Sequence, residues 1–181
     1  MYHIARFIFY VKGWKLYGHI PEGLRKCIII QAPHTSMTDF FIGWLGSKIL
    51  KVKFRFMIKK EAFIFPIAGV LKNMGGIPVD RGKSQGVVKQ IVGVFNSSES
   101  LYLIITPEGT RKYTAHWKKG FYYMAKAAQV PILLGYIDYK KKICGIGEQL
   151  NMTGDFEEDF KKIEDFYRGV NAKYPEKFNL S

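Results

Sequence analysis

The stretch Cys27-Ile28-Ile29-Ile30-Gln31-Ala32-Pro33-His34-Thr35-Ser36-Met37-Thr38-Asp39 joins a short apolar run to the start of a helix. A continuous apolar run of this length is typical of a strand that is buried on both faces of a sheet. Ser36 followed by Asp39 is a capping-box pattern, so we expect a helix that begins at Ser36 and covers about 37–50. The sequence therefore predicts a buried strand, a polar loop and a helix in direct succession.

The same alternation of strand and helix continues along the chain. We expect further strands at 53–59, 75–78, 101–105, 130–137 and 142–147, and further helices at 66–71, from Ser84, at 120–128 and at 155–170. This order indicates an α/β fold, with a central sheet flanked by helices on both faces. The lysine-rich turn at 139–141 joins two strands directly, so the sheet is expected to be mixed, although largely parallel. A chain of 181 residues without repeat or linker fits a single domain, 1–181.

The composition is basic and aromatic. There are 28 basic against 15 acidic residues, a formal net charge of +13, and 15% of the residues are aromatic. Such a balance favours anionic partners, which include phospholipid headgroups, nucleic acids and phosphate-bearing cofactors. The basic residues are dispersed instead of forming a stripe interleaved with stacking aromatics, which argues against nucleic acid.

Residues 1–20 are predicted to form an aromatic and basic helix. Its apolar side chains are spread around the cylinder, so it must be buried, either against its own domain or in a membrane interface. No run reaches the roughly 18 apolar residues of a spanning helix, and no signal-peptide cleavage site follows. Cys27 and Cys144 fit neither a disulfide framework nor a zinc motif, and are expected to be buried in a reducing compartment. We expect a peripheral protein at the cytoplasmic face of the membrane.

The loop after the first buried strand holds His34 and Asp39. If His34 lies before the helix and Asp39 in its first turn, the imidazole can fold back onto the carboxylate. Asp39 then accepts a hydrogen bond from one ring nitrogen and leaves the other as a base. The alternative is that Asp39 only caps the helix and that His34 is an ordinary loop residue.

Two later loops also carry polar residues where predicted strands end. The 75–84 loop lacks P-loop spacing, but its Arg81 can grip a phosphate or pair with Asp80. The loop at 106–111 offers Glu108 for a hydroxyl and Arg111 for an anion, or forms a plain turn with a surface salt bridge. Sites in open α/β sheets form at the carboxyl ends of strands, where these loops lie.

Taken together, these loops resemble the motifs of the lysophosphatidic acid acyltransferase (PlsC-like) family of glycerolipid acyltransferases. The His-x4-Asp motif of the family matches His34 and Asp39, and its Gly-x-x-(Phe/Pro)-(Ile/Val)-Asp-Arg motif resembles the run from Gly76 to Arg81. Its Phe-Pro-Glu-Gly-Thr-Arg motif matches 107–111, with Thr106 in place of the aromatic residue, and its Val-Pro-Ile motif matches 130–132. The resemblance covers 27–138.

The resemblance implies that His34 is a general base and that Asp39 orients it. It also implies contacts to the substrate phosphate or glycerol from Lys59, Arg81, Glu108, Gly109, Thr110 and Arg111. No cofactor or metal is implied, because the acyl donor, acyl-CoA or acyl-ACP, is a substrate. The expected partners are this donor and the phospholipid surface of a membrane, without nucleic acid. Only 33 residues precede His34, so the longer hydrophobic anchor of many relatives is expected to be shortened.

Acyl transfer from a thioester requires the acceptor hydroxyl to lose its proton as it attacks, which suits a histidine. No Ser or Cys stands in a nucleophile-elbow context, so we expect direct attack, with helix-start amides near Ser36 or the glycine-bearing loops stabilising the oxyanion. The favoured reaction makes phosphatidic acid from lysophosphatidic acid. Two alternatives stay open: a lyso-aminolipid acceptor, and a non-catalytic module that binds membrane or nucleic acid. Five aromatic residues are expected either to line an acyl groove or to belong to the ordinary core: Phe40, Phe41, Trp44, Phe63 and Phe65.

Overall fold

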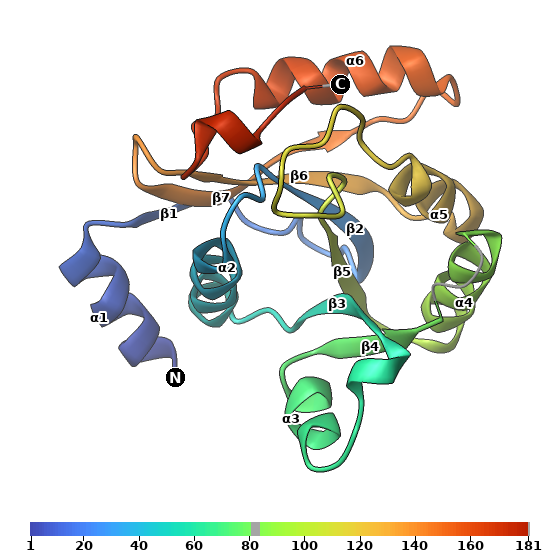
Figure 1. The fold of residues 1–181 in the computed structure, drawn as a ribbon, viewed down its shortest axis with the longest axis horizontal. Coiled ribbons are helices and arrows are strands. Elements are labelled where there is room, and N and C mark those ends of the chain that lie inside the picture. The colour runs from blue at the N-terminus through green and yellow to red at the C-terminus, as the bar shows by residue number, and fades with distance from the viewer. Residues whose placement is uncertain (81–83, 181) are drawn as a thin grey trace.

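The structure is a computed structural model that describes residues 1–80 and 84–180. Strands and helices alternate along most of this part of the chain (Figure 1). The elements are α1 (Tyr2–Lys12), β1 (Lys15–Tyr17), β2 (Lys26–Ala32), α2 (Met37–Leu50), β3 (Phe54–Lys59), η1 (Lys60–Ala62), α3 (Ile67–Asn73), β4 (Gly76–Val79), α4 (Ser84–Ser97), β5 (Leu101–Ile105), α5 (Gly120–Ala128), β6 (Ile132–Asp138), β7 (Ile143–Leu150), α6 (Phe156–Tyr167) and η2 (Pro175–Lys177).

The described residues form a seven-stranded sheet in the order β1-β7-β6-β2-β5-β3-β4. Only β6 and β7 pair antiparallel, and the other neighbours are parallel. The prediction of a mixed, largely parallel sheet is confirmed, and the tight 139–141 turn is the reason for its antiparallel pair. Strand β2 lies in the middle, between β6 and β5, so the loop that carries His34 leaves the centre of the sheet.

Helices cover both faces of the sheet, as predicted. Ile28 and Ile30 of β2 point to the face covered by α4, α5 and α6, whereas Cys27 and Ile29 point to the face on which α2 lies. Tyr167 of α6 donates its hydroxyl to the carbonyl oxygens of Ile30 and Gly135, both at 2.9 Å, and so ties α6 to the two central strands. The sheet between these helix layers is the scaffold that positions the loops.

The predicted N-terminal helix over 1–20 is wrong in its second half. The helix ends at Lys12, because Gly13 adopts a left-handed conformation with φ of 71° and stops it. Residues 15–17 then form β1, which pairs with β7 at the edge of the sheet. A strand of three residues is too short to show a periodicity in the sequence.

The sheet opens between β3 and β5. Strand β5 pairs with β3 only as far as the pair of Phe56 and Ile104. Beyond this pair, 57–59 of β3 pair with β4, while Ile105 pairs with Ile30 of β2. The carboxyl ends of β3 and β5 therefore separate, and the gap between them lies beside the loops that follow β2 and β5.

Candidate active site

His34 and Asp39 come together in the loop between β2 and α2. The Nδ1 atom of His34 lies 3.4 Å from Oδ2 of Asp39, and the imidazole is 19% exposed while the carboxylate is almost completely buried. This separation is longer than a typical hydrogen bond of about 2.7–3.2 Å, as is common for catalytic pairs without substrate. The other ring nitrogen, Nε2, is not engaged by the carboxylate.

The Asp39 carboxylate is also held by the protein around it. Its Oδ2 atom accepts hydrogen bonds from the backbone N–H groups of Thr35 and Ser36, each at 2.8 Å, and Ser36 forms the predicted capping box. Its Oδ1 atom accepts a hydrogen bond of 2.6 Å from the hydroxyl of Tyr139, which stands between β6 and β7. The carboxylate thus joins the His34 loop, the first turn of α2 and a residue 100 positions away.

The hydrogen bonds to Asp39 outweigh the cost of burying it. Burial by itself would raise the pKa of the Asp39 carboxyl, but the hydrogen bonds from His34, Tyr139 and the Ser36 amide hold this pKa below its ordinary value. Burial and the Asp39 carboxylate both raise the pKa of Tyr139, so its hydroxyl remains a donor at neutral pH. Asp39 is therefore an anion that faces His34.

Glu108 connects the 106–111 loop to the same place. Its Oε1 atom accepts a hydrogen bond of 2.8 Å from the backbone N–H of His34. Its Oε2 atom is buried and has no hydrogen-bond partner among the described residues. Burial raises the pKa of the Glu108 carboxyl to about 7, so this carboxyl is partly protonated near neutral pH.

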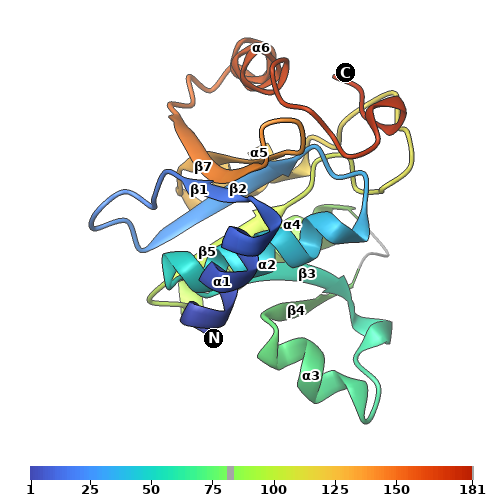
Figure 2. The ribbon, with the colours of Figure 1, turned by 90° about the vertical axis from the view of Figure 1, so that its left-hand side faces the viewer.

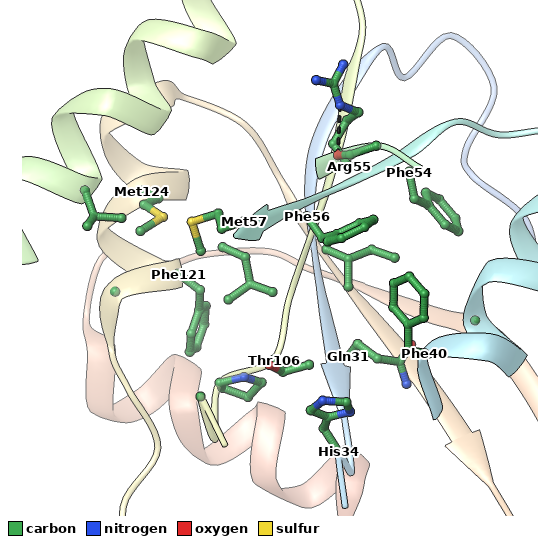
Figure 3. A pocket seen from close by; sticks show the side chains of 18 of the residues that line it. Gln31, His34, Phe40, Phe54, Arg55, Phe56, Met57, Thr106, Phe121 and Met124 are labelled. Carbon is green, nitrogen blue, oxygen red and sulfur yellow. Dashed lines mark hydrogen bonds between the residues drawn. The ribbon is translucent and has the colours of Figure 1, made fainter. Parts of the chain in front are cut away.

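A cavity of about 1470 Å³ begins at His34 and Asp39 and extends between α2, β3, β5, α4 and α5. Figure 3 shows His34 at one end and Arg55 at the other, with Phe40, Phe56 and Met57 among the side chains between them. This volume is larger than the roughly 300–1,000 Å³ of common ligand pockets. Much of the wall is apolar, and the cationic lining residues are Lys48, Lys53, Arg55, Lys72, Lys89, Lys118 and Lys119.

The cavity has walls on both faces of the sheet. Phe54, Phe56 and Ile104 face α2, and the ring of Phe56 lies 5.2 Å from that of Phe40. Met57 and Ile105 face the opposite side, where they pack with the cluster formed by α4 and α5. The separation of β3 from β5 after Phe56 connects the two sides.

The structure brings together only part of the predicted substrate-binding set. Gly109 lines the cavity with a φ of 65°, and the Lys118 side chain covers it so closely that an added Cβ would lie 2.8 Å from Lys118 Cε. Lys59 is exposed at the carboxyl end of β3 and Arg111 is exposed in the loop that follows β5, and neither they nor Thr110 line the cavity. Arg81 lies outside the described residues.

One expectation about the loops is corrected in part. The amides of Thr35, Ser36 and Thr38 are not free to stabilise an oxyanion, because those of Thr35 and Ser36 bind Asp39 and that of Thr38 binds Ser36 Oγ. The capping box that positions Asp39 consumes these donors.

Two of the five aromatic residues expected in an acyl groove or in the core line the cavity. Phe40 and Trp44 line the cavity, since one face of α2 turns toward β3. The other three do not line it: Phe41 and Phe65 are exposed, and Phe63 is half-buried.

Two polar residues of the site were not singled out from the sequence. Tyr139 was assigned to a turn, and only the pairing of β6 beside β2 brings it to Asp39. Gln31 lines the cavity from β2, and in the described part of the chain its Nε2 amide is a buried donor without a partner. Neither residue carries a local pattern that marks it, because its role depends on contacts between strands.

In the part of the chain that the structure describes, no cluster of His, Cys, Asp and Glu side chains is arranged to hold a metal ion. Within the same residues, no helix has the length and apolarity that crossing a membrane requires.

Comparison with known proteins identifies the family. Residues 16–134 match the family model described as Acyltransferase. The crystal structure of the 1-acyl-sn-glycerophosphate (LPA) acyltransferase PlsC from Thermotoga maritima has a similar fold, with a TM-score of 0.66 and 19% sequence identity over 93% of this chain and 76% of that chain. No curated protein gives a significant match. Because the family model spans more than half of the chain, this protein belongs to the Acyltransferase family and is an acyltransferase.

Proposed function

We propose that this enzyme transfers a fatty acyl group from an acyl thioester to the free hydroxyl of a lysophospholipid. The acceptor is lysophosphatidic acid, the product is phosphatidic acid, and the donor is acyl-CoA or acyl-ACP. The observation that carries the proposal is the position of His34, between a buried carboxylate and the mouth of a large, mostly apolar cavity. The structural relative from Thermotoga maritima is named for this acceptor, which supports the choice.

His34 acts as the general base in this reaction. Its Nδ1–H is donated to Asp39, which leaves the lone pair of Nε2 for the acceptor hydroxyl. As that hydroxyl loses its proton to Nε2, its oxygen attacks the thioester carbonyl carbon and a tetrahedral oxyanion forms. The carbon–sulfur bond then breaks, and the leaving thiolate takes the proton from the imidazolium. No cofactor or metal enters, because thioester and alcohol supply every reacting atom.

The surroundings of His34 suit the two substrates. The apolar walls of the cavity match a fatty acyl chain, whose transfer from water to such walls is favourable by about 0.8 kcal/mol per buried CH₂. Lys118 lies over Gly109 at the cavity wall and offers a cation to a phosphate group. The family resemblance adds Lys59, Arg81 and Arg111 as proposed phosphate contacts, and Glu108 and Thr110 as proposed contacts to the glycerol hydroxyls. Because Lys59, Thr110 and Arg111 do not line the cavity, they would meet the part of the headgroup that lies outside it.

The enzyme works at the phospholipid surface of a membrane, on its cytoplasmic face. One side of α1 is buried through Ala5 and Phe9, whereas Phe7 and Tyr10 on the other side are exposed, next to the basic Arg6 and Lys12. An exposed aromatic face beside basic residues is typical of a helix that lies in a membrane interface. The free thiols of Cys27 and Cys144 agree with a reducing compartment.

Replacing His34 by alanine tests the proposal directly. We expect His34→Ala to lower turnover by at least about 10²–10⁴-fold, because the base is lost, while the fold is retained. The measurement is release of free thiol from acyl-CoA in the presence of lysophosphatidic acid, with circular dichroism to check folding. His19→Ala, which changes an exposed histidine, is the matched control. Near-normal rates for the His34 variant would remove this residue from the chemistry.

Tyr139 is expected to position Asp39. Tyr139→Phe removes one donor to a buried carboxylate, and a hydrogen bond to a charged group contributes about 1.5–3 kcal/mol, so kcat should fall about tenfold with little change in KM. Tyr113→Phe, in an exposed tyrosine, should leave both constants unchanged. In an Asp39→Asn background the Tyr139 change should have almost no further effect, because both act through the same carboxylate. Additive losses would show that Tyr139 acts elsewhere.

Glu108 is expected to make stability depend on pH. Because its pKa in the folded protein is about 7 and its ordinary value is 4.5, its contribution to stability is complete below pH 4.5 and is lost as the pH rises through 7. Glu108→Gln has no such titration. The unsubstituted protein should therefore lose stability relative to Glu108→Gln between pH 5 and pH 8. In urea titrations, the difference between their free energies of unfolding (variant minus unsubstituted protein) should rise by on the order of 2–3 kcal/mol. Glu99→Gln, in an exposed residue, should show a constant difference, and the same constancy for Glu108→Gln would refute the shift.

The acceptor is tested by changing its phosphate contacts. Arg81→Ala should lower kcat/KM for lysophosphatidic acid about tenfold or more, since a charge-assisted hydrogen bond contributes about 1.5–3 kcal/mol. A lyso-ornithine or lyso-glycine lipid has no phosphate, so its turnover should change little. Arg25→Ala, in an exposed arginine, is the control. If the enzyme prefers the aminolipid and is indifferent to the Arg81 change, the acceptor is not a lysophospholipid.

A further inference from the structure

A second apolar surface lies on the segment between β3 and β4, which holds η1 and α3. None of residues 60–74 is buried. Phe65 is 96% exposed, and Ile64, Ile67 and Val70 are between 49% and 60% exposed. We call these four residues the α3 patch. It is separate from the cavity, which none of its members lines.

The packing of the segment does not explain why the α3 patch is apolar. Helix α3 has seven residues and no buried side chain, so the core does not hold it. Both ribbon views show it projecting from the edge of the sheet below β4 (Figures 1 and 2). Four large apolar side chains are exposed within seven positions of one short segment, and exposed apolar side chains that gather in this way mark surfaces that another phase or molecule covers.

The charges around the α3 patch favour an anionic lipid surface. Between Phe54 and Val79 the chain has four basic residues, Arg55, Lys59, Lys60 and Lys72, and one acidic residue, Glu61. At the opposite pole, α6 carries five acidic residues and two lysines. A protein with this polarity turns the α3 side toward anionic headgroups and α6 away from them.

The α3 patch is placed so that it can reach a membrane together with α1. In Figures 1 and 2 the N-terminus of α1 and the whole of α3 lie in the lower part of the view, whereas α6 and the C-terminus lie at the top. The exposed face of α1 carries Ile4, Phe7 and Tyr10. Two separate apolar contacts restrict the tilt of a protein on a plane more than one contact does.

We propose that the α3 patch inserts into the interface of an anionic phospholipid bilayer, as a second contact beside α1. Next to the patch in sequence, Lys72, Asn73, Met74 and Gly75 line the cavity that also holds His34, so insertion brings one end of that cavity to the lipid surface. This inference rests on the proposed lipid substrate for the identity of the partner. Its test measures binding alone, so its outcome is independent of turnover.

A label at position 65 reports insertion directly. Cys27 and Cys144 are buried and burial raises the pKa of both thiols to about 12, so a maleimide carrying the NBD fluorophore should react selectively with the F65C variant. Vesicles of phosphatidylglycerol and phosphatidylcholine should shift the NBD emission to shorter wavelength, and a label placed by T114C on the 106–119 segment should not respond. An unchanged spectrum at position 65 would overturn the proposal.

Partition into the same vesicles measures the contribution of the patch. Ile64→Ser with Phe65→Ser should weaken binding about 10- to 100-fold in co-sedimentation, as expected for two apolar side chains that leave the lipid. Tyr113→Ser, which removes an exposed aromatic residue outside the patch, should not weaken binding. Both variants should turn over a water-soluble short-chain acceptor at the rate of the unsubstituted protein, because neither site lines the cavity.

Other occupants of the patch give different results. If a second copy of the chain covers it, analytical ultracentrifugation without lipid will show a dimer that Ile64→Ser with Phe65→Ser dissociates, and the proposal is wrong. If the double variant binds vesicles as well as the unsubstituted protein, the proposal is also wrong. An enzyme that inserts position 65 but fails to acylate any lysophospholipid would leave this inference standing and refute the proposed function.

Discussion

The buried Asp39 carboxylate is the constraint on which the site depends, because an unpaired charge at this depth would cost several kcal/mol. It is tolerated since donors from the His34 loop, from the cap of α2 and from Tyr139 converge on its two oxygens. The same hydrogen bonds therefore stabilise the anion and fix three chain segments around it. The imidazole of His34 occupies the remaining approach to Oδ2, so its orientation follows from satisfying the carboxylate. The Asp39 carboxylate thus holds the loop together and orients His34. Removing any of its hydrogen-bond donors is therefore expected to alter both the local structure and the proposed chemistry.

The parts of the molecule that were predictable are those with a local cause. The capping box at Ser36 and Asp39 placed α2 at Met37–Leu50, as observed, because a cap acts within one turn of the chain. Continuous apolar runs located β2 and β5 for a similarly local reason. Strand β1 was missed because Lys15–Tyr17 gains its structure only from pairing with β7, more than a hundred residues away. Tyr139 was missed on the same grounds: its sequence neighbours are a lysine-rich turn, and its partner is reached only through the order of the strands.

The cavity is also a feature that depends on long-range strand pairing and not on a local pattern. The residues of β3 show only a strand pattern, and nothing in them indicates that pairing with β5 stops at Phe56. That early end, in a sheet whose other central strands stay paired, allows Phe56 on one face and Met57 on the other to border a single space. The family motifs include His34 and Asp39, the proposed base and its carboxylate, but they carry no information about this volume. In the proposed reaction, the length of acyl chain that fits is therefore set by strand pairing and by the side chains that line the cavity, such as Phe40 and Phe121.

At the edge of the sheet next to the cavity, apolar side chains are exposed without an open edge strand that could pair with a strand of another molecule. Strand β4 is the last in the sheet, and its Pro78 lies opposite Ile58 of β3. Proline has no N–H to donate, so the outer side of β4 cannot continue the hydrogen-bonded ladder there. The apolar side chains that follow β3, Phe65 foremost, are instead presented on a short helical excursion whose backbone groups are not those of an open strand. A fluid hydrocarbon phase accepts such side chains without requiring strand pairing, whereas a second protein chain would gain most from the ladder that Pro78 blocks. The geometry of this edge thus disfavours self-association by strand pairing, for a reason independent of the surrounding charges.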